Sequence, residues 1–338
     1  MTAGVKPGLM LGYWGADRWD PIDLVLEAER LGFDSVWTSE AYGSDAFSPL
    51  CWIGARTERI KLGTGIVQIS ARTPAAVAMT AATVDHLSNG RLILGLGVSG
   101  PQVVEGWYGQ PFAKPLARTR EYVEVLRGIL RREGPVSHDG EHYPLPYRGP
   151  GSAGLGKPLK LTVHPLRSDI PIYLGAEGLK NVALAIEIAD GWMPIFFSPY
   201  RSDVYRDSLV GMRDGFEIAC PVTVIVGDDV AACLITVKWY LAFYIGGMGA
   251  PEANFHFDLV SRFGFHEEAE RVRKLFFEGR REEAAAAVPD DLADEISLVG
   301  PPARIKERLQ PWIDSPVTQL LAGTRDPTAL RVLAENLL

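Results

Sequence analysis

Short apolar stretches alternate along the chain with longer segments in which apolar residues recur every three or four positions. The first pattern predicts buried strands and the second predicts amphipathic helices. The predicted strands cover residues 7–14, 35–40, 60–69, 91–98, 171–175, 192–197, 221–226 and 318–322. The predicted helices cover residues 22–31, 49–57, 75–87, 118–131, 178–189, 199–215, 228–244 and 328–336. Eight strands alternating with eight helices predict an α/β fold of the (β/α)8 type, the TIM barrel.

We expect one domain over residues 1–338 with three insertions. They lie at about 99–117, 134–170 and 249–300. The second is rich in glycine and proline, and Asp139-Gly140 within it is typical of a hairpin turn. The third is charged, and we expect it to be helical.

Local signals mark the ends of several helices. Thr73-Pro74 is typical of a helix start, with threonine as the N-cap and proline at the first helical position. Asn89-Gly90 is typical of the end of the same helix. In the first helix Ile22, Val25, Leu26 and Leu31 are expected to face inward, and Gly32 ends it.

Composition narrows the class of protein. The 338 residues are 47% hydrophobic and 22% charged, which is typical of a globular protein with a large core. The net charge of -8 argues against general binding to nucleic acid or to anionic membranes. We see neither a signal peptide nor an apolar run long enough to span a membrane. Three widely spaced cysteines indicate free thiols in a reducing cytoplasm.

Two motifs resemble common sites without the context that these sites need. Gly95-x-Gly97-x-x-Gly100 matches a dinucleotide fingerprint, but Pro101 follows it and no ribose-binding acid ends the next strand. The strand glycines leave room for a flat ring, or else allow tight barrel packing. His138 and His142 straddle a turn without a third ligand, so we expect no metal site. Asp85 is expected to pair with Arg91.

Three motifs carry a resemblance to a known family. They are Leu87-Ser88-Asn89-Gly90-Arg91, Leu94-Gly95-Leu96-Gly97 and Ser99-Gly100-Pro101-Gln102. They resemble the bacterial luciferase-like monooxygenase superfamily, and more narrowly its branch that uses coenzyme F420, an 8-hydroxy-5-deazaflavin. The resemblance spans about the whole chain and is most specific over residues 37–122 and 171–199.

This resemblance implies an F420-dependent oxidoreductase, similar to methylenetetrahydromethanopterin reductase. Such an enzyme transfers a hydride between C5 of the deazaflavin and a small organic substrate. One alternative is an FMN-dependent monooxygenase of the luciferase type, and another is a non-catalytic barrel that binds a flavin. The family usually forms dimers, so a homodimer or a higher homo-oligomer is expected.

The resemblance also implies where the ring of the cofactor lies. In these families a non-proline cis peptide forms a bulge at the position of Gly65-Ile66 and backs the ring, the alternative being an ordinary strand. The residues expected to border the ring and its ribityl chain follow the next strand. They are Val98, Ser99, Gly100, Gln102 and Val103.

A carboxylate at the end of the second strand is the candidate for catalysis. Glu40 would lie in the mouth of the barrel, where it could contact the ring's polar edge or relay a proton. Related sugar-phosphate dehydrogenases have an acid-histidine pair here, but this chain has Ala41 after the acid, which argues against that activity. The alternative for Glu40 is a structural ion pair.

The turn after the fifth strand is where the family places the cofactor's phosphate. Free amides at a helix start attract phosphate, Lys180 would add charge, and Glu177 would oppose binding unless turned away. The alternative is a plain turn. The candidate phosphate-binding residues are Gly175, Ala176, Glu177, Gly178, Lys180 and Asn181. Trp14, Trp107 and Tyr108 are candidate walls of the substrate space.

Overall fold

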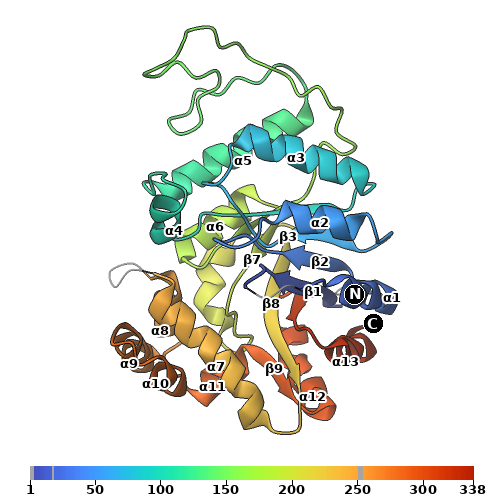
Figure 1. Cartoon of the computed structure of the whole chain (residues 1–338), viewed down its shortest axis with the longest axis vertical. Helices are drawn as coiled ribbons and strands as arrows, with labels where there is room; N and C mark the ends of the chain where they lie inside the picture. The colour runs from blue at the N-terminus through green and yellow to red at the C-terminus, as the bar shows by residue number, and fades with distance from the viewer. Residues whose placement is uncertain (1–3, 17–18, 250–253) are drawn as a thin grey trace.

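Eight parallel strands close into a barrel that helices surround, which confirms the predicted TIM barrel (Figure 1). The computed structural model describes residues 4–16, 19–249 and 254–338, so residues 250–253 of the third predicted insertion lie outside the described residues. The barrel strands are β1 Lys6–Gly12, β2 Ser35–Thr38, β3 Lys61–Thr64, β5 Leu92–Gly97, β6 Ile172–Gly175, β7 Gly191–Met193, β8 Glu217–Val226 and β10 Gln319–Gly323. The last strand pairs with both β1 and β8 and closes the circle.

Two further short strands extend this sheet. Strand β4 (Val67–Gln68) continues β3 beyond a break and pairs with β5. Strand β9 (Ser297–Gly300) pairs with the carboxyl end of β8. We expected residues 249–300 to be helical throughout, so β9 is a correction. Its four residues are too few to establish a two-residue periodicity.

Helices cover the outside of the barrel. Those of the barrel itself are α1 Ile22–Leu31, α2 Phe47–Gly54, α3 Pro74–Leu87, α5 Pro115–Arg131, α6 Leu179–Ile188, α7 Val230–Gly247, α12 Pro302–Asp314 and α13 Pro327–Leu337. Those in the insertions are α4 Pro101–Gly106, α8 Phe255–Arg262, α9 His266–Phe277, α10 Arg281–Ala286 and α11 Asp290–Glu295. The expected helix over 199–215 is instead a shorter 3-10 helix, η1 Ser202–Leu209, and α12 was not predicted.

The predicted start of α3 and end of α1 are confirmed. The prediction that Leu26 faces inward was wrong. The Thr73 side chain accepts a hydrogen bond from the Ala76 amide, and Gly32 ends α1 with a φ of 95°. Leu26 of α1 is 40% exposed, because Leu24 and Val25 occupy the inner face in its place.

The second insertion forms an arm that projects beyond α3 and α5 (Figure 1). Asp139-Gly140 lies inside a wider loop, closed by an antiparallel bridge between His138 and Leu145. Asp85 pairs with Arg167 of this arm at 2.5 Å and not with Arg91, which corrects the prediction. Arg91 instead donates to four backbone carbonyl groups.

Helix α7 is apolar enough, and long enough, to pass for a membrane span by length and composition alone. It is the one such helix in the part of the chain that the structure describes. It packs against α8, α9, α10 and α11, and its Lys238 forms an ion pair with Asp290 at 2.7 Å. Core helices of globular proteins share this composition.

A polar cluster closes the base of the barrel. Glu217 at the start of β8 contacts the Lys6 ammonium of β1 at 2.6 Å and accepts a hydrogen bond from the Thr318 hydroxyl at 2.5 Å. Burial raises the pKa of Glu217, but the bonds from Lys6 and Thr318 outweigh it and leave the pKa below its usual value. The charged carboxylate therefore stabilises the closed barrel.

We expect Glu217→Gln to destabilise the protein by about 1.5–3 kcal/mol at pH 7. Because the folded pKa is lowered, the contribution of Glu217 is present above an unfolded pKa of about 4.3 and is lost as the pH falls through the folded value. The variant should thus differ most from the wild type at neutral pH and converge with it in acid. Urea denaturation at several pH values measures this, and a constant difference down to the lowest pH would contradict it.

Candidate functional site

The Gly65–Ile66 peptide bond is cis, as the family resemblance implied. Residues 65 and 66 form the break between β3 and β4 at the carboxyl edge of the barrel. The Gly65 carbonyl accepts a hydrogen bond from the Ser39 hydroxyl at 2.6 Å, and the Ile66 carbonyl accepts one from the Glu40 amide at 3.2 Å. The end of β2 therefore holds both carbonyl groups of this bulge.

The strand glycines serve tight packing around this bulge. A Cβ on Gly95 would lie 1.9 Å from the Thr64 carbonyl oxygen, and one on Gly97 would lie 2.7 Å from Ile66 Cδ1. A Cβ on Gly175 of β6 would lie 3.1 Å from Ile66 Cγ2. Of the two interpretations of Gly95 and Gly97, the structure favours packing over room for a ring. The space at Gly97 is filled by Ile66 of the bulge, and that at Gly95 by the end of β3.

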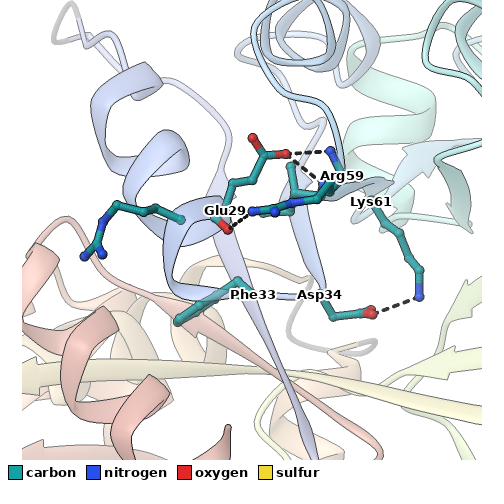
Figure 2. Close-up of a pocket in the computed structure, with 8 residues that line it drawn as sticks. Glu29, Phe33, Asp34, Arg59 and Lys61 are labelled. Carbon is teal, nitrogen blue, oxygen red and sulfur yellow. Dashed lines mark hydrogen bonds and ion pairs between the residues drawn. The ribbon is translucent and has the colours of Figure 1, made fainter.

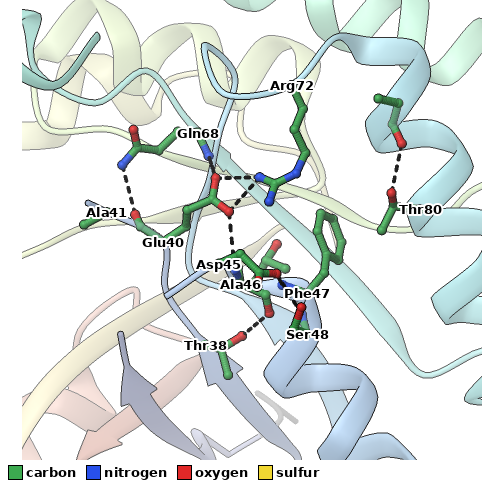
Figure 3. A network of polar contacts seen from close by, with 12 residues as sticks. Thr38, Glu40, Ala41, Asp45, Ala46, Phe47, Ser48, Gln68, Arg72 and Thr80 are labelled. Carbon is green, nitrogen blue, oxygen red and sulfur yellow. Dashed lines mark hydrogen bonds and ion pairs between the residues drawn. The ribbon is translucent and has the colours of Figure 1, made fainter. Parts of the chain in front are cut away.

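Glu40 is buried and forms an ion pair with Arg72 (Figure 3). The Arg72 Nη1 atom lies 2.7 and 2.6 Å from the two carboxylate oxygens. These oxygens also accept hydrogen bonds from the amides of Ala46 and Gln68, each at 3.3 Å. The structural ion pair left open for Glu40 is thus present, and its contacts tie the end of β2 to β4.

The segment after β5 begins a helix sooner than expected. Gly100 is the N-cap of α4 and Pro101 its first residue, with Ser99 just before it at a φ of 61°. A left-handed conformation at a non-glycine residue is uncommon and is often found at functional sites. Val98, Ser99, Gly100 and Val103 are partly buried, whereas Gln102 is exposed.

The turn after β6 leads into α6. Gly178 is its N-cap, so the amides of Leu179 and Lys180 precede the first helical hydrogen bond, whereas the Asn181 amide bonds the Gly178 carbonyl at 2.8 Å. Glu177 is turned toward α8, where its Oε1 atom lies 2.9 Å from His256 Nδ1. Lys180 is exposed, Ala176 is buried, and the Asn181 Oδ1 atom is buried without a hydrogen-bond partner in the described residues.

The candidate substrate walls are only partly gathered at this edge. The Tyr108 hydroxyl donates to the Ala41 carbonyl at 3.3 Å, next to Glu40. Burial and the Glu40 charge raise the pKa of Tyr108. Trp14 is partly buried and donates from its indole nitrogen to the Trp19 carbonyl. Trp107 is 65% exposed, so its role as a wall stays a prediction.

An aromatic cluster that the sequence did not predict lies at this edge. It consists of Phe196, Tyr240, Tyr244 and His256, whose ring centroids lie 4.7–5.8 Å apart. Phe196 follows β7 and has a φ of 55°, which is unusual for a bulky residue. The tyrosines lie on α7 and the histidine on α8, so only the fold brings them together. The four-residue spacing of Tyr240 and Tyr244 was the one local signal.

A cavity of about 430 Å³ lies at the opposite end of the barrel (Figure 2). Its charged groups are already used: the Lys61 ammonium bonds Asp34 at 2.9 Å, and Glu29 accepts from the amide of Arg59. Charges engaged in this way at the amino-terminal face of a barrel indicate stability rather than catalysis. In the described ranges no group of three potential metal ligands occurs, and His138 faces Glu121 at 3.6 Å.

Comparisons with known proteins agree with this architecture. Residues 13–319 match the family model described as luciferase-like monooxygenase. A provisionally named coenzyme F420-dependent oxidoreductase of Mycobacterium tuberculosis is 51% identical over 344 residues, covering 99% of both chains. The 5,10-methylenetetrahydromethanopterin reductase of Archaeoglobus fulgidus is 30% identical over 311 residues, covering 88% of this chain and 87% of the relative.

A solved structure resembles the whole fold. The coenzyme F420-dependent tetrahydromethanopterin reductase from Methanopyrus kandleri superimposes with a TM-score of 0.79 and 24% identity, covering 99% of both chains. At this identity the likeness supports the fold of the chain.

Proposed function

The chain belongs to the luciferase-like monooxygenase family, and on that premise we propose that it is an oxidoreductase that binds coenzyme F420. When bound, the deazaflavin would give or take a hydride at C5, and the partner in this exchange would be a small organic substrate. The observation that carries the proposal is the convergence of the bulge at residues 65–66, the residues after β5 and the start of α6 at one edge of the barrel. The Ile66 side chain lies next to Gly97 and Gly175, since a Cβ added to either glycine would meet it.

The residues at this edge fit a ring with an anionic tail. Ile66 offers a partly buried apolar surface for the ring, and Ser99 and Gly100 follow Gly97, the last residue of β5. The amides at the start of α6 and the Lys180 ammonium would hold a phosphate. The amide N–H groups carry partial positive charge, and the ammonium carries a full one. The Glu177 carboxylate does not oppose this, because it is turned toward His256.

Glu40 would act on the cofactor through the bulge. Its carboxylate is engaged with Arg72 and with the amides of Ala46 and Gln68, and its own backbone amide bonds the Ile66 carbonyl, so we assign it the role of holding the segment around the bulge in position. A rigid platform reduces the entropy lost when a ring is oriented for hydride transfer. We therefore place Glu40 among the positioning residues, and a direct contact with the ring's polar edge stays a prediction.

Parallel fluorescence titrations with oxidised coenzyme F420 and with FMN test the proposal. We expect the dissociation constant for F420 to be at least about tenfold lower, since the anionic tail adds contacts at α6. Tighter binding of FMN, together with oxygen consumption in the presence of reduced FMN, would favour the monooxygenase alternative. Binding without turnover on a broad panel would favour the non-catalytic barrel.

Lys180→Gln tests the phosphate position. We expect the dissociation constant for F420 to rise by roughly twofold to fivefold, because Lys180 is exposed and contributes as a screened charge. The loss should shrink as salt is added. Lys61→Gln, which removes a cation at the base of the barrel, is the matched control and should leave binding unchanged. Equal effects of the two variants would exclude a local contact at Lys180.

A further inference from the structure

A histidine at the carboxyl edge, nearly buried beside a carboxylate, has no role of its own in the function described so far. His256 Nδ1 and Glu177 Oε1 lie 2.9 Å apart, and the two side chains are 14% and 11% exposed. Glu177 follows β6, whereas His256 is in the first turn of α8, so the pair joins the barrel to the third insertion. Glu177 Oε2 and His256 Nδ1 are both buried without a hydrogen-bond partner among the residues described, so the 2.9 Å approach of the two side chains is a close polar contact rather than an aligned hydrogen bond.

Aromatic rings surround this pair. The Tyr244 and Phe196 ring centroids lie 4.7 and 5.8 Å from that of His256, both in edge-to-face orientation. Burial, followed by the charges of Tyr240, Tyr13 and Glu177, raises the pKa of Tyr244 well above its usual value. The tyrosine therefore stays neutral near pH 7, and its hydroxyl accepts a hydrogen bond from the Tyr240 hydroxyl at 3.2 Å.

Tyr13 connects this cluster to the cofactor edge. A Cβ placed on Gly43, close after Glu40 in the chain, would lie 3.3 Å from the Tyr13 ring. Tyr13 also lies within electrostatic reach of both tyrosines of α7. The His256–Glu177 contact, the aromatic cluster and the loop after β2 therefore belong to one rim of the barrel.

Hydride transfer to a carbonyl carbon requires a proton at the oxygen, and Glu40 is poorly placed to supply it. Arg72 contacts both of its carboxylate oxygens, and two amides occupy them further. An imidazole beside a carboxylate is a common proton-exchanging arrangement near neutral pH. His256 has this partner, and Arg262 of the same helix fixes the turn by donating to the Glu177 carbonyl at 3.0 Å.

We propose that His256, oriented by Glu177, exchanges a proton with the oxygen of a carbonyl substrate or of its alcohol, and that the aromatic rings receive the substrate's apolar body. This inference rests on the proposed function. In reduction, bound F420 would supply the hydride to the carbonyl carbon, the π electron pair would move to the oxygen, and the oxygen would take a proton from the His256 imidazolium. The neutral imidazole then regains a proton from solvent, and oxidation of the alcohol reverses each step.

The position of His256 is tested by thiol labelling, a measurement that does not require enzyme turnover. In the variant His256→Cys, we would measure the rate at which methyl methanethiosulfonate labels the introduced thiol, with and without oxidised F420 at ten times its dissociation constant. Labelling should slow on the order of tenfold, as expected for a site that the cofactor covers. The native Cys51 on α2 is exposed and should be labelled at an unchanged rate, so each molecule carries its own control.

A fluorescence titration of the same sample separates the two hypotheses. If the wild type does not bind F420, the proposed function fails. If the cofactor binds but the introduced thiol is labelled as fast as before, the cofactor edge does not include position 256 and the inference is overturned.

Steady-state kinetics test whether His256 exchanges a proton with the substrate. With simple ketones and aldehydes as acceptors for reduced F420, His256→Gln should lower kcat by roughly 10²- to 10⁴-fold and remove one limb of its pH profile. Affinity for F420 should be unchanged. No turnover of these acceptors by the wild type would overturn the carbonyl class, and an unchanged pH profile in the variant would overturn the role of His256.

Two control variants separate proton exchange from docking of α8. Arg262→Met removes the other contact between α8 and residue 177, and His266→Gln replaces an exposed histidine of α9. A docking role would give Arg262→Met the same loss of kcat as His256→Gln. We expect Arg262→Met to keep the shape of the pH profile and His266→Gln to match the wild type.

Discussion

Arg72→Met is expected to lower the free energy of unfolding by about 3 kcal/mol or more, because it leaves the Glu40 carboxylate buried without its cation. The Glu40 side chain is 4% exposed, so water cannot replace the guanidinium (Figure 3). Affinity for the cofactor should fall with stability, since the same carboxylate bonds the Gln68 amide, two residues after the bulge. Urea denaturation followed by circular dichroism, with an F420 titration beside it, measures both effects.

The double variant Glu40→Gln with Arg72→Met separates a charge effect from lost packing. Removing both charges should restore much of the stability, because no uncompensated carboxylate remains. Arg206→Met breaks the exposed pair with Asp203 and should have little effect, as is usual for surface ion pairs. A double variant as unstable as Arg72→Met alone would show that the arginine acts through packing.

Gly95→Ala is expected to cost about 3 kcal/mol or more, the upper end of what overpacking a core costs. The added Cβ would lie 1.9 Å from the Thr64 carbonyl oxygen and 3.1 Å from Met193 Sδ. The nearest atom belongs to the backbone of β3, so relief requires a shift of the strand that leads into the bulge. Thermal and urea unfolding measure the loss.

Two glycine variants calibrate this result. Gly128 lies within α5, and a Cβ there would meet no atom within 4 Å, so Gly128→Ala should stabilise the protein by roughly 0.5–1 kcal/mol. Gly97→Ala would press on Ile66 Cδ1, the flexible end of a side chain, and should cost less than Gly95→Ala while weakening F420 binding. A Gly95→Ala variant as stable as the wild type would contradict the packing role.

Local chemistry explains what the sequence predicted well. Thr73 and Pro74 suit a helix start wherever they occur, and Gly32 suits a left-handed helix end. Regular alternation of strands and helices was enough for the barrel, because parallel strands with short crossovers have few ways to close. The cis bond at Gly65–Ile66 was anticipated through the family resemblance and not through any physical signal in the residues.

Contacts between distant residues explain what the sequence missed. Arg72 lies 32 positions from Glu40, and Arg167 lies 82 positions from Asp85, so no local pattern indicates either pair. The contact of His256 could not be predicted for the same reason, since its carboxylate partner belongs to a loop after β6. The sites of the ring, the phosphate and the substrate are still predictions on this chain.

The arm between α5 and β6 is a suitable place to insert a tag or a label. Arg132 bonds the Leu161 carbonyl at 2.7 Å and Arg167 holds Asp85, so the arm is anchored to the body on its return, whereas residues 151–160 are exposed throughout. Exposed segments between anchored ends tolerate insertions well. An affinity tag or a fluorophore placed there would report on the protein without touching the carboxyl edge of the barrel, where the proposed chemistry takes place.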